Sequence, residues 1–511
     1  MFISNIGVVD LSTKRLDSDF YRPDYIENDR LLSDHKVTTL SSCGKFFAGP
    51  FGSKLPSNLY LSKGVPLFRV GNVGLFEVDE GGFAYLDPIV HSELNSSEVV
   101  SGDLLIVKAS VGEKICRVPE SLPKANITQH IIAIRPNGKF DIDFVSVFLV
   151  CNYGRKQLER FSLGSIIQYL GINDARDVKL LDIGVNAQKY IGDKVRQAEC
   201  LRDLAKTIET EVSEFHEQFV PDQSQLNYGR KTRRVDTSRM TDRFDAHFYP
   251  GVVDDYLSQS GINFHSLSSL CVDIFNGQTQ GEQGGGVFVD QITVTNLSRS
   301  FVKGTPRRVI KPANDTKYTK SFDLLMCNAA HNKSYIGREF SYCHSERELL
   351  PSTEVMVIRV STEKVPASFI RYYLLTKLGF VQVQSTIRGI TAHSYPTDMA
   401  KLDIPLPNVP DSMREEWFEC DQRMALAGHA CELATLLTAG AKSIVEALIE
   451  DRLTEQQIIL AQQSLDGGDD SLDREILSSL SSNKLGAVSA PLFTDLNQLY
   501  GLLAQCQQAE D

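Results

Sequence analysis

One long helical pattern, from Gln188 to Phe219, constrains the fold of this chain more than any other feature. Its apolar residues recur at steps of three and four, which is the spacing of a single buried stripe. They are Ile191, Val195, Ala198, Leu201, Leu204, Ile208, Val212, Phe215 and Phe219. At 1.5 Å per residue such a helix is about 48 Å long. A helix of that length needs a partner along much of its stripe.

A second pattern of the same kind runs from Met413 to Glu450. Its stripe comprises Trp417, Cys420, Met424, Ala427, Cys431, Ala434, Leu437, Ala441, Ile444 and Leu448. The plain interpretation is two ordinary core helices. The sharper one is an antiparallel coiled-coil pair that sets the distance between two globular parts.

The sequence before each long helix is written twice. RLDSDFYRP at 15–23 returns as RFDAHFYP at 243–250, and five further echoes follow in the same order. They are 103–105 with 323–325, 131–135 with 355–359, Phe144 with Phe369, Gly164 with Gly389, and 181–183 with 402–404. The offsets stay between 220 and 228 residues. Ordered matches of this kind, each closing on a long helix, indicate an internal duplication.

Each copy is predicted to be mixed α/β, so the fold class is α/β (α+β) with two duplicated domains, the helix pair and a small helical tail. Strands are expected at 66–70, 104–107, 131–134, 324–327 and 355–360, and helices at 144–158 and 369–378. The predicted boundaries are 1–35 (N-terminal segment), 36–187 (first copy), 188–220 (first helix), 221–242 (linker), 243–411 (second copy), 412–450 (second helix) and 451–511 (tail). Within the tail we expect short helices at 472–480 and 492–503, which cap the long helices or dock a partner.

Composition excludes some classes of protein. The 511 residues are too many for one core. No apolar run reaches membrane-spanning length, and no signal peptide is indicated at the N-terminus. The ten cysteines form no C-x-x-C pair, so neither a disulfide framework nor a zinc site is predicted, and a cytoplasmic location is expected.

Charge is distributed unevenly along the chain. The net charge is −12, but the tail alone holds ten acidic and three basic side chains. The run from Arg230 to Arg239 is instead basic, and it is either a solvated linker or a segment that faces phosphates.

Several motifs lie in or beside the loops of the two copies. They are GPFGSKL (49–55), GVPLFRVGNV (64–73), SGDLLIVKAS (101–110), NITQHIIAIRP (126–136), the run 164–185 and, in the second copy, 389–407. With these motifs and the duplication, the chain resembles the specificity subunits of type I restriction-modification systems. In the second copy FNGQTQGEQGGG (275–286) stands in the place of GPFGS. The resemblance covers about residues 15–450, and a related phage-defence methylation complex stays open as the system that the chain serves.

The resemblance implies two target-recognition domains that read the halves of a bipartite, asymmetric DNA target. It implies that the chain is not an enzyme. Its partners would be double-stranded DNA, two DNA methyltransferase (M) subunits, and a restriction and translocation (R) subunit in some systems. S-adenosylmethionine would bind the partner methyltransferase, so no cofactor is expected in this chain.

The side chains expected to contact DNA lie on or beside loops and carry amide, guanidinium, ammonium, imidazole or hydroxyl groups. In the first copy they are Lys45, Ser53, Lys54, Arg69, Asn72, Lys108, Ser110, Gln129, Ser165 and Gln168. In the second copy they are Gln278, Gln280, Asn296, Asn328, His331, Lys333, Ser334, Arg388, Thr391 and His393. About a third of them are expected to touch DNA, and for any one residue a solvated loop position is the simpler interpretation.

No catalytic or metal site is predicted. The Asn-Pro-Pro-aromatic motif of an amino-methyltransferase is absent, and the glycines at 281–286 are not followed by the Gly-Lys-Ser/Thr of a phosphate-binding loop. Two alternatives nevertheless stay open. One is a methyltransferase or nuclease fused to recognition domains, and the other is a duplicated module that binds carbohydrate or protein.

Overall fold

The structure is a computed structural model. It describes residues 6–7, 11–12, 15–50, 52–109, 114–164, 169–220, 222–224, 226–228, 235, 237, 240–258, 263–282, 286–313, 317–344, 347–482 and 490–510. The chain divides into two compact units. Unit 1 comprises Met1–Leu201 and Leu433–Asp511, and unit 2 comprises Arg202–Glu432.

Two four-stranded sheets form the globular part of unit 1. The first has the order β2 (Gly44–Ala48), β9 (Ile131–Pro136), β6 (Leu104–Val107) and β7 (Ile115–Arg117), all antiparallel. The second has the order β4 (Ala84–Leu86), β3 (Val65–Phe68), β8 (Lys124–Ile127) and β5 (Glu98–Val100), with β3 and β8 parallel. Phe68, Leu105 and Ile131 belong to one buried cluster that joins both sheets.

Unit 2 repeats this topology over the described residues, with three strands in place of four in its second sheet. One sheet has the order β12 (Cys271–Asn276), β19 (Val355–Val360), β15 (Leu324–Cys327) and β17 (Ser341–Tyr342). The other has the order β14 (Arg307–Ile310), β13 (Phe288–Ile292) and β18 (Leu350–Pro351), again with one parallel pair, β13 with β18. The register also repeats, because Leu104 faces Ile134 in unit 1 and Leu324 faces Ile358 in unit 2. The predicted duplication in fold is therefore confirmed.

The repeated segment RxD…FY forms the same hydrogen-bonded loop in each unit. In unit 1 the Arg15 Nε donates to Asp17 at 2.6 Å, and the Asp17 Oδ1 caps the backbone N–H of Phe20. The Tyr21 hydroxyl donates to the Arg15 carbonyl at 2.6 Å, which closes the loop. Unit 2 repeats these contacts with Arg243, Asp245, Phe248 and Tyr249.

The single helix predicted at 144–158 is wrong, and so is the one predicted at 369–378. Each is two helices, α3 (Ile142–Val150) and α4 (Asn152–Phe161) in unit 1, and α9 (Ala367–Leu375) and α10 (Lys377–Ser385) in unit 2. The chain breaks at Cys151 and Thr376, which are extended with ψ of 163° and 161°. A Cβ at Gly154 or Gly379 would lie 1.9 or 2.2 Å from a carbonyl oxygen of the preceding helix, so glycine permits the sharp turn. Both first helices are buried on nearly every face, which hides the break from periodicity.

Shorter elements complete the two units. A two-stranded sheet precedes each long helix and pairs β1 (Val37–Thr39) with β10 (Lys179–Leu181), and β11 (Asn263–Ser266) with β21 (Asp403–Leu406). The remaining short helices are α1 (Pro23–Ser33), α2 (Pro88–Glu93), α5 (Ile172–Arg176), α7 (Gly251–Leu257), α8 (Leu267–Leu270) and α11 (Pro396–Met399). The remaining short strand pairs among the described residues are β16 (Ala329–Ala330) with β20 (Ala392–His393) in unit 2, and β22 (Ser481–Ser482) with β23 (Ala490–Pro491) in unit 1.

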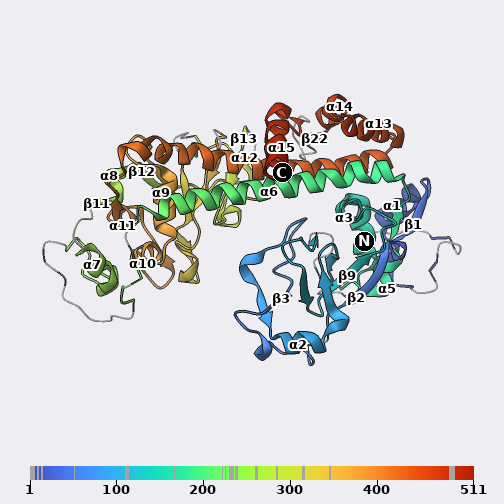
Figure 1. Ribbon diagram of the computed structural model, residues 1–511, viewed down its shortest axis with the longest axis horizontal. Coiled ribbons are helices and arrows are strands. Elements are labelled where there is room, and N and C mark those ends of the chain that lie inside the picture. The colour runs from blue at the N-terminus through green and yellow to red at the C-terminus, as the bar shows by residue number, and fades with distance from the viewer. Residues whose placement is uncertain are drawn as a thin grey trace. The chain divides into compact units, whose positions relative to one another are not determined.

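The two long helices are present as predicted, within a few residues at each end. They are α6 (Val185–Glu217) and α12 (Arg414–Ile449), and each is continuous (Figure 1). Helix α6 starts in unit 1 and ends in unit 2, whereas α12 starts in unit 2 and ends in unit 1, so they run between the units in opposite directions. In unit 2 an ion pair from Glu211 to Arg423 joins them. None of the helices in the described ranges is both long and apolar enough to cross a bilayer.

The C-terminal tail is helical, as predicted, and packs on the long helices within unit 1. It contains α13 (Glu455–Asp466), α14 (Ser471–Ser479) and α15 (Leu496–Glu510), of which α13 was not predicted. Lys189 on α6 pairs with Asp466 at 3.1 Å, and the buried Lys194 pairs with the buried Asp473 at 2.7 Å. The tail therefore covers the first half of α6.

One buried histidine makes unit 2 sensitive to pH. His216 on α6 is fully buried, its Nε2 lies 3.0 Å from the Ser368 hydroxyl on α9, and its Nδ1 has no hydrogen-bond partner in the described part of the chain. Burial lowers its pKa to about 3. The unfolded chain, with a histidine pKa near 6.5, therefore binds a proton more readily than the folded chain between about pH 3 and 6.5.

We therefore expect the stability of unit 2 to fall as the pH drops below about 6.5. The contribution of His216 is about 2 kcal/mol at pH 5 relative to pH 7. Urea unfolding at both pH values, followed by fluorescence of the single tryptophan, Trp417, which lies in unit 2, measures it. His216→Phe should flatten this pH dependence, whereas replacing the exposed His331 by Phe should leave it unchanged. An equal pH dependence in His216→Phe and the wild type would contradict the assignment.

Candidate nucleic-acid interface

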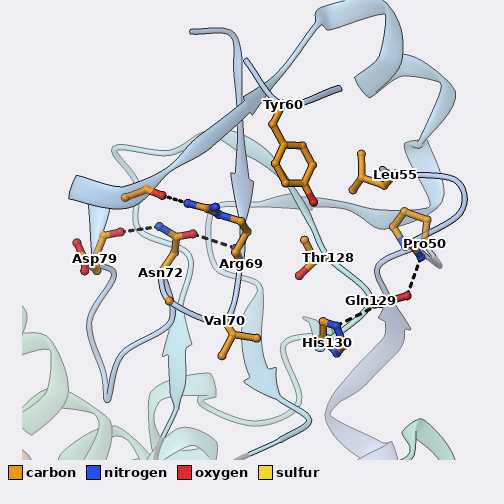
Figure 2. A pocket seen from close by; sticks show the side chains of 13 residues that line it. Pro50, Leu55, Tyr60, Arg69, Val70, Asn72, Asp79, Thr128, Gln129 and His130 are labelled. Atoms are coloured by element: carbon orange, nitrogen blue, oxygen red, sulfur yellow. Dashed lines mark hydrogen bonds between the residues drawn. The ribbon is translucent and has the colours of Figure 1, made fainter. Parts of the chain in front are cut away.

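A cleft of about 550 Å³ opens in unit 1 beside the ends of β2, β3 and β8 (Figure 2). It is lined by Pro50, Gly52, Leu55, Tyr60, Arg69, Val70, Gly71, Asn72, Asp79, Gly82, Thr128, Gln129 and His130. Three of the side chains expected to contact DNA, those of Arg69, Asn72 and Gln129, are therefore brought together here. Their surroundings can be compared position by position with unit 2.

A glycine lets the first loop cross the end of a neighbouring strand in both units. A Cβ at Gly49 would lie 2.2 Å from the backbone of Thr128, and a Cβ at Gly277 would lie 2.1 Å from the Pro351 carbonyl oxygen. Comparison of the two copies placed FNGQTQGEQGGG opposite GPFGS. The structure explains this match, because in both loops a glycine crosses the end of a neighbouring strand. The two loops leave the sheet from equivalent positions.

An asparagine braces the second loop in both units. The buried Asn72 accepts the backbone N–H of Arg69 at 2.9 Å and donates to the Asp79 carbonyl at 3.0 Å. The buried Asn296 accepts the N–H of Thr293 at 3.0 Å and donates to the Lys303 carbonyl at 2.9 Å. Both side-chain amides are hydrogen-bonded within the protein, so we do not propose either of them as a base-contacting group.

The third brace differs in chemistry between the units. The buried Lys108 donates from Nζ to the Gln129 carbonyl at 2.7 Å, and burial lowers its pKa. At the equivalent position the buried Asn328 donates from Nδ2 to the Thr353 carbonyl at 3.0 Å. In both units the backbone frame is the same, since the N–H of residue 108 or 328 donates to the carbonyl of His130 or Glu354. These two residues also hold loops.

The rim of the cleft carries different groups in the two units. In unit 1 the Gln129 Oε1 accepts the N–H of Gly52 at 2.7 Å, and its Nε2 lies 3.2 Å from the His130 ring (Figure 2). In unit 2 the matching residue is Thr353, whose hydroxyl lies 2.9 Å from that of Thr279. Both units thus keep a side-chain contact between the two loops. The groups at this contact are an amide and an imidazole in unit 1 and two hydroxyls in unit 2.

Arg69 shows the same contrast most clearly. Its side chain is exposed, lines the cleft and donates to the Gly82 carbonyl. Thr293 occupies the equivalent position in unit 2, since its N–H makes the same bond to the bracing asparagine. A guanidinium can donate two parallel hydrogen bonds to a guanine edge, whereas a threonine hydroxyl cannot.

A short hairpin in unit 2 holds three further predicted residues. Arg388 pairs with His393 across it, and the Arg388 guanidinium binds the buried Asp398 at 2.5 and 2.6 Å. The His393 Nδ1–H donates to the Thr391 carbonyl, 2.7 Å away, and the ring stacks on Tyr395. The side chain between them, Ile390, is fully exposed.

The other predicted residues are placed as follows. The side chains of Lys45, Ser53, Lys54, His331, Lys333 and Ser334 are exposed, and those of Gln278 and Gln280 are half-buried. Ser110, Ser165 and Gln168, together with the basic residues Arg230, Lys231, Arg233, Arg234 and Arg239, lie outside the described residues. Contact of any of these side chains with DNA stays a prediction.

Sequence reasoning missed several residues of the cleft. Tyr60, Asp79, Thr128 and His130 line it, and Thr128 and Ser352 begin equivalent turns, because each donates its N–H to the end of the parallel strand beside it. Continuing the alignment of the two copies backward from IIAIR and VMVIR would have found this pair. Asp79 and Tyr60 come from segments with no echo in the second copy.

A scan against family models and a search of curated proteins give no match. Three solved structures are similar to this chain over most of its length. The S subunit of a type I restriction-modification system from M. genitalium is 11% identical, with 84% of this chain and 94% of that chain covered and a TM-score of 0.36. The HsdS subunit from Thermoanaerobacter tengcongensis is 15% identical, with 82% and 97% covered and a TM-score of 0.28. A structure described as showing complex assembly and conformational transition of the type I R-M system is 14% identical, with 84% and 97% covered and a TM-score of 0.26.

Proposed function

We propose that this chain is a non-enzymatic DNA-recognition subunit of a type I-like restriction-modification or phage-defence methylation complex. Each unit reads one half of a bipartite, asymmetric target. Double-stranded DNA is the ligand, and the loops around the cleft of unit 1 and their counterparts in unit 2 form the reading surface.

One observation carries the proposal. The two units share a backbone frame in these loops, with the same glycine crossing and the same asparagine brace. On that frame the side chains differ, with the exposed Arg69 and the half-buried Gln129 in unit 1, and the half-buried Thr293 and the exposed Thr353 in unit 2. A duplicated scaffold with different hydrogen-bonding groups is what two different half-sites require, because base edges are distinguished by their donor and acceptor patterns.

The proposal also assigns the partners. The long helices and the tail offer surfaces for two DNA methyltransferase subunits, and in some complexes for a restriction and translocation subunit. S-adenosylmethionine then binds the methyltransferase. The chain itself supplies recognition, and methyl transfer needs the partner.

Selection of double-stranded DNA from a random library by the purified chain tests the proposal. We expect a split motif, with affinity that falls steeply between 50 and 200 mM salt because phosphate contacts release counterions. Arg69→Ala should weaken binding to the selected site by about 10- to 100-fold, the loss of about 1–3 kcal/mol from one bidentate base contact. It should relax base preference in one half only.

The matched control is Arg155→Ala, an exposed arginine of unit 1 that pairs with Glu159 on the same helix at 2.8 Å. It removes the same charge from the same unit away from the cleft, so the selected motif should not change. Relaxed preference in both halves after Arg69→Ala would refute the assignment of one unit to one half-site. Binding of an oligosaccharide or peptide library in place of DNA would favour the duplicated non-DNA module.

A further inference from the structure

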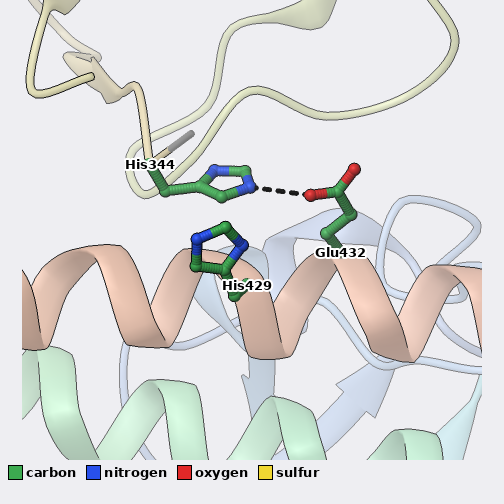
Figure 3. A group of neighbouring side chains, drawn as sticks. All are labelled: His344, His429 and Glu432. Atoms are coloured by element: carbon green, nitrogen blue, oxygen red, sulfur yellow. Dashed lines mark hydrogen bonds and ion pairs between the residues drawn. The ribbon is translucent and has the colours of Figure 1, made fainter. Parts of the chain in front are cut away.

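Three side chains of unit 2 that could each supply a metal ligand meet at one face of α12 (Figure 3). His429 and Glu432 are one helical turn apart and so lie on the same face. His344 approaches them from the segment that follows β17. One ligand atom from each residue lies within 4.8 Å of the other two, and this is the one group of its kind among the described residues.

The geometry of the group is specific. The His344 Nε2 lies 3.0 Å from the Glu432 Oε2, and the rings of His344 and His429 are 5.0 Å apart and nearly perpendicular. Figure 3 shows the His344 ring facing the Glu432 carboxylate, with the His429 ring beside the His344 ring. Two imidazole nitrogens and a carboxylate oxygen at this separation form a ligand set that zinc favours, with a fourth position left for water.

A glycine on α12 makes room for His344. A Cβ at Gly428 would lie 2.3 Å from the His344 Cβ, so only glycine allows His344 to reach this depth on α12. The three ligands are neither fully buried nor fully exposed, which leaves access for an ion and water.

An ordinary histidine–glutamate pair elsewhere in the chain looks different. His91 also contacts a carboxylate, that of Glu98 at 2.8 Å, but its other ring nitrogen faces the Asn126 amide at 3.3 Å. No second imidazole joins that pair within the described residues. The group on α12 therefore has a feature that an ion pair does not need, namely a second imidazole with a ligand atom within 4.8 Å of the other two.

We propose that His344, His429 and Glu432 bind a divalent transition-metal ion, zinc first, which fastens the recognition part of unit 2 to α12. Nitrogen ligands favour zinc over the oxygen-preferring magnesium and calcium. The site does not depend on the proposed function. A bound metal ion would hold the segment that carries His344 to α12, whatever ligand unit 2 recognises.

Equilibrium dialysis of the full, tag-free chain against micromolar zinc chloride, with metal counted by mass spectrometry, tests the site. We expect one zinc ion per chain, no comparable binding of magnesium, and visible absorption bands of low-coordinate cobalt when cobalt replaces zinc. His429→Ala and Glu432→Gln should each weaken zinc binding at least tenfold. His331→Ala, at an exposed histidine of the same unit, is the matched control and should bind as the wild type does.

A second variant separates the ligands from the fold. Gly428→Ala keeps all three ligand residues in the sequence but displaces His344 from the other two. It should therefore also lose zinc, while circular dichroism shows that the chain is folded. Zinc should raise the melting temperature of the wild type and of His331→Ala but not of Glu432→Gln. Equal zinc binding by the wild type, His429→Ala and Glu432→Gln, or no stoichiometric zinc on the wild type, would overturn the proposal and leave His344 and Glu432 as an ion pair only.

Discussion

Replacing Asp473 by alanine is expected to destabilise unit 1 by about 3–5 kcal/mol, because it leaves the ammonium group of Lys194 buried without a partner. Lys194 and Asp473 are both almost completely buried, with their charged atoms 2.7 Å apart. The carboxylate also accepts hydrogen bonds from the hydroxyls of Tyr190, at 2.5 Å, and Tyr500. One side chain of α14 thus holds α6 and α15 together.

The measurement is urea unfolding of the full chain together with hydrogen exchange of α13, α14 and α15. We expect Asp473→Ala to lower the unfolding midpoint and to remove exchange protection from these helices first. Asp470→Ala is the matched control, because Asp470 pairs with Arg474 in the same helix region but on the surface. It should cost less than about 1 kcal/mol. A change below about 1 kcal/mol in Asp473→Ala would show that the buried cluster does not fasten the tail.

Inserting four residues into α6 alone, between Leu201 and Arg202, is expected to abolish binding to the bipartite target. Residues before the insertion are packed in unit 1 and residues after it in unit 2, and α12 passes through both units without a break. The insertion shifts one packed segment by about 6 Å along the helix and leaves the other in place. Because α12 keeps its original length, it cannot pack against both the shifted and the unshifted segment of α6.

A second insertion of four residues into α12, between Glu432 and Leu433, should restore binding with a changed gap. DNA rises about 3.4 Å per base pair, so a pair longer by about 6 Å should move the preferred half-sites apart by one or two base pairs. Binding to a set of targets with graded gaps measures this. If the double insertion binds best at the original gap, the helices do not set the spacing.

Features governed by local chemistry were predictable from the sequence. The stripes of α6 and α12 were visible because helical periodicity repeats over many turns, and residues such as Ile191, Ile208 and Ala434 are indeed buried. The strands at 104–107 and 131–136 follow from short apolar runs. The duplication was visible because the two copies keep the side chains that make the same bonds, as Asp17 and Asp245 do.

The break between α3 and α4 depends on tertiary packing. Where every face of a helix is buried, apolar residues occupy all positions, so periodicity no longer marks the end of the element. Cys151 and Gly154 reveal the turn only through the close approach of the preceding backbone.

Tertiary packing also decides which of the predicted DNA-contacting residues are buried. Asn72, Lys108, Asn296 and Asn328 carry the polar groups that a DNA-reading surface needs, yet they are buried and bonded to loop carbonyls. An exposed asparagine and a bracing asparagine are identical in sequence. The difference lies in which carbonyl the fold places within hydrogen-bond distance.

The repeat, the two long helices and the mixed α/β class are predictable without coordinates, because each is encoded by residues that are near one another in the chain or that recur in order. Which residues meet across long separations depends on tertiary packing. It brought His344 to His429 and Glu432, and Asp473 to Lys194. No local pattern specifies such meetings, because they depend on how whole elements pack.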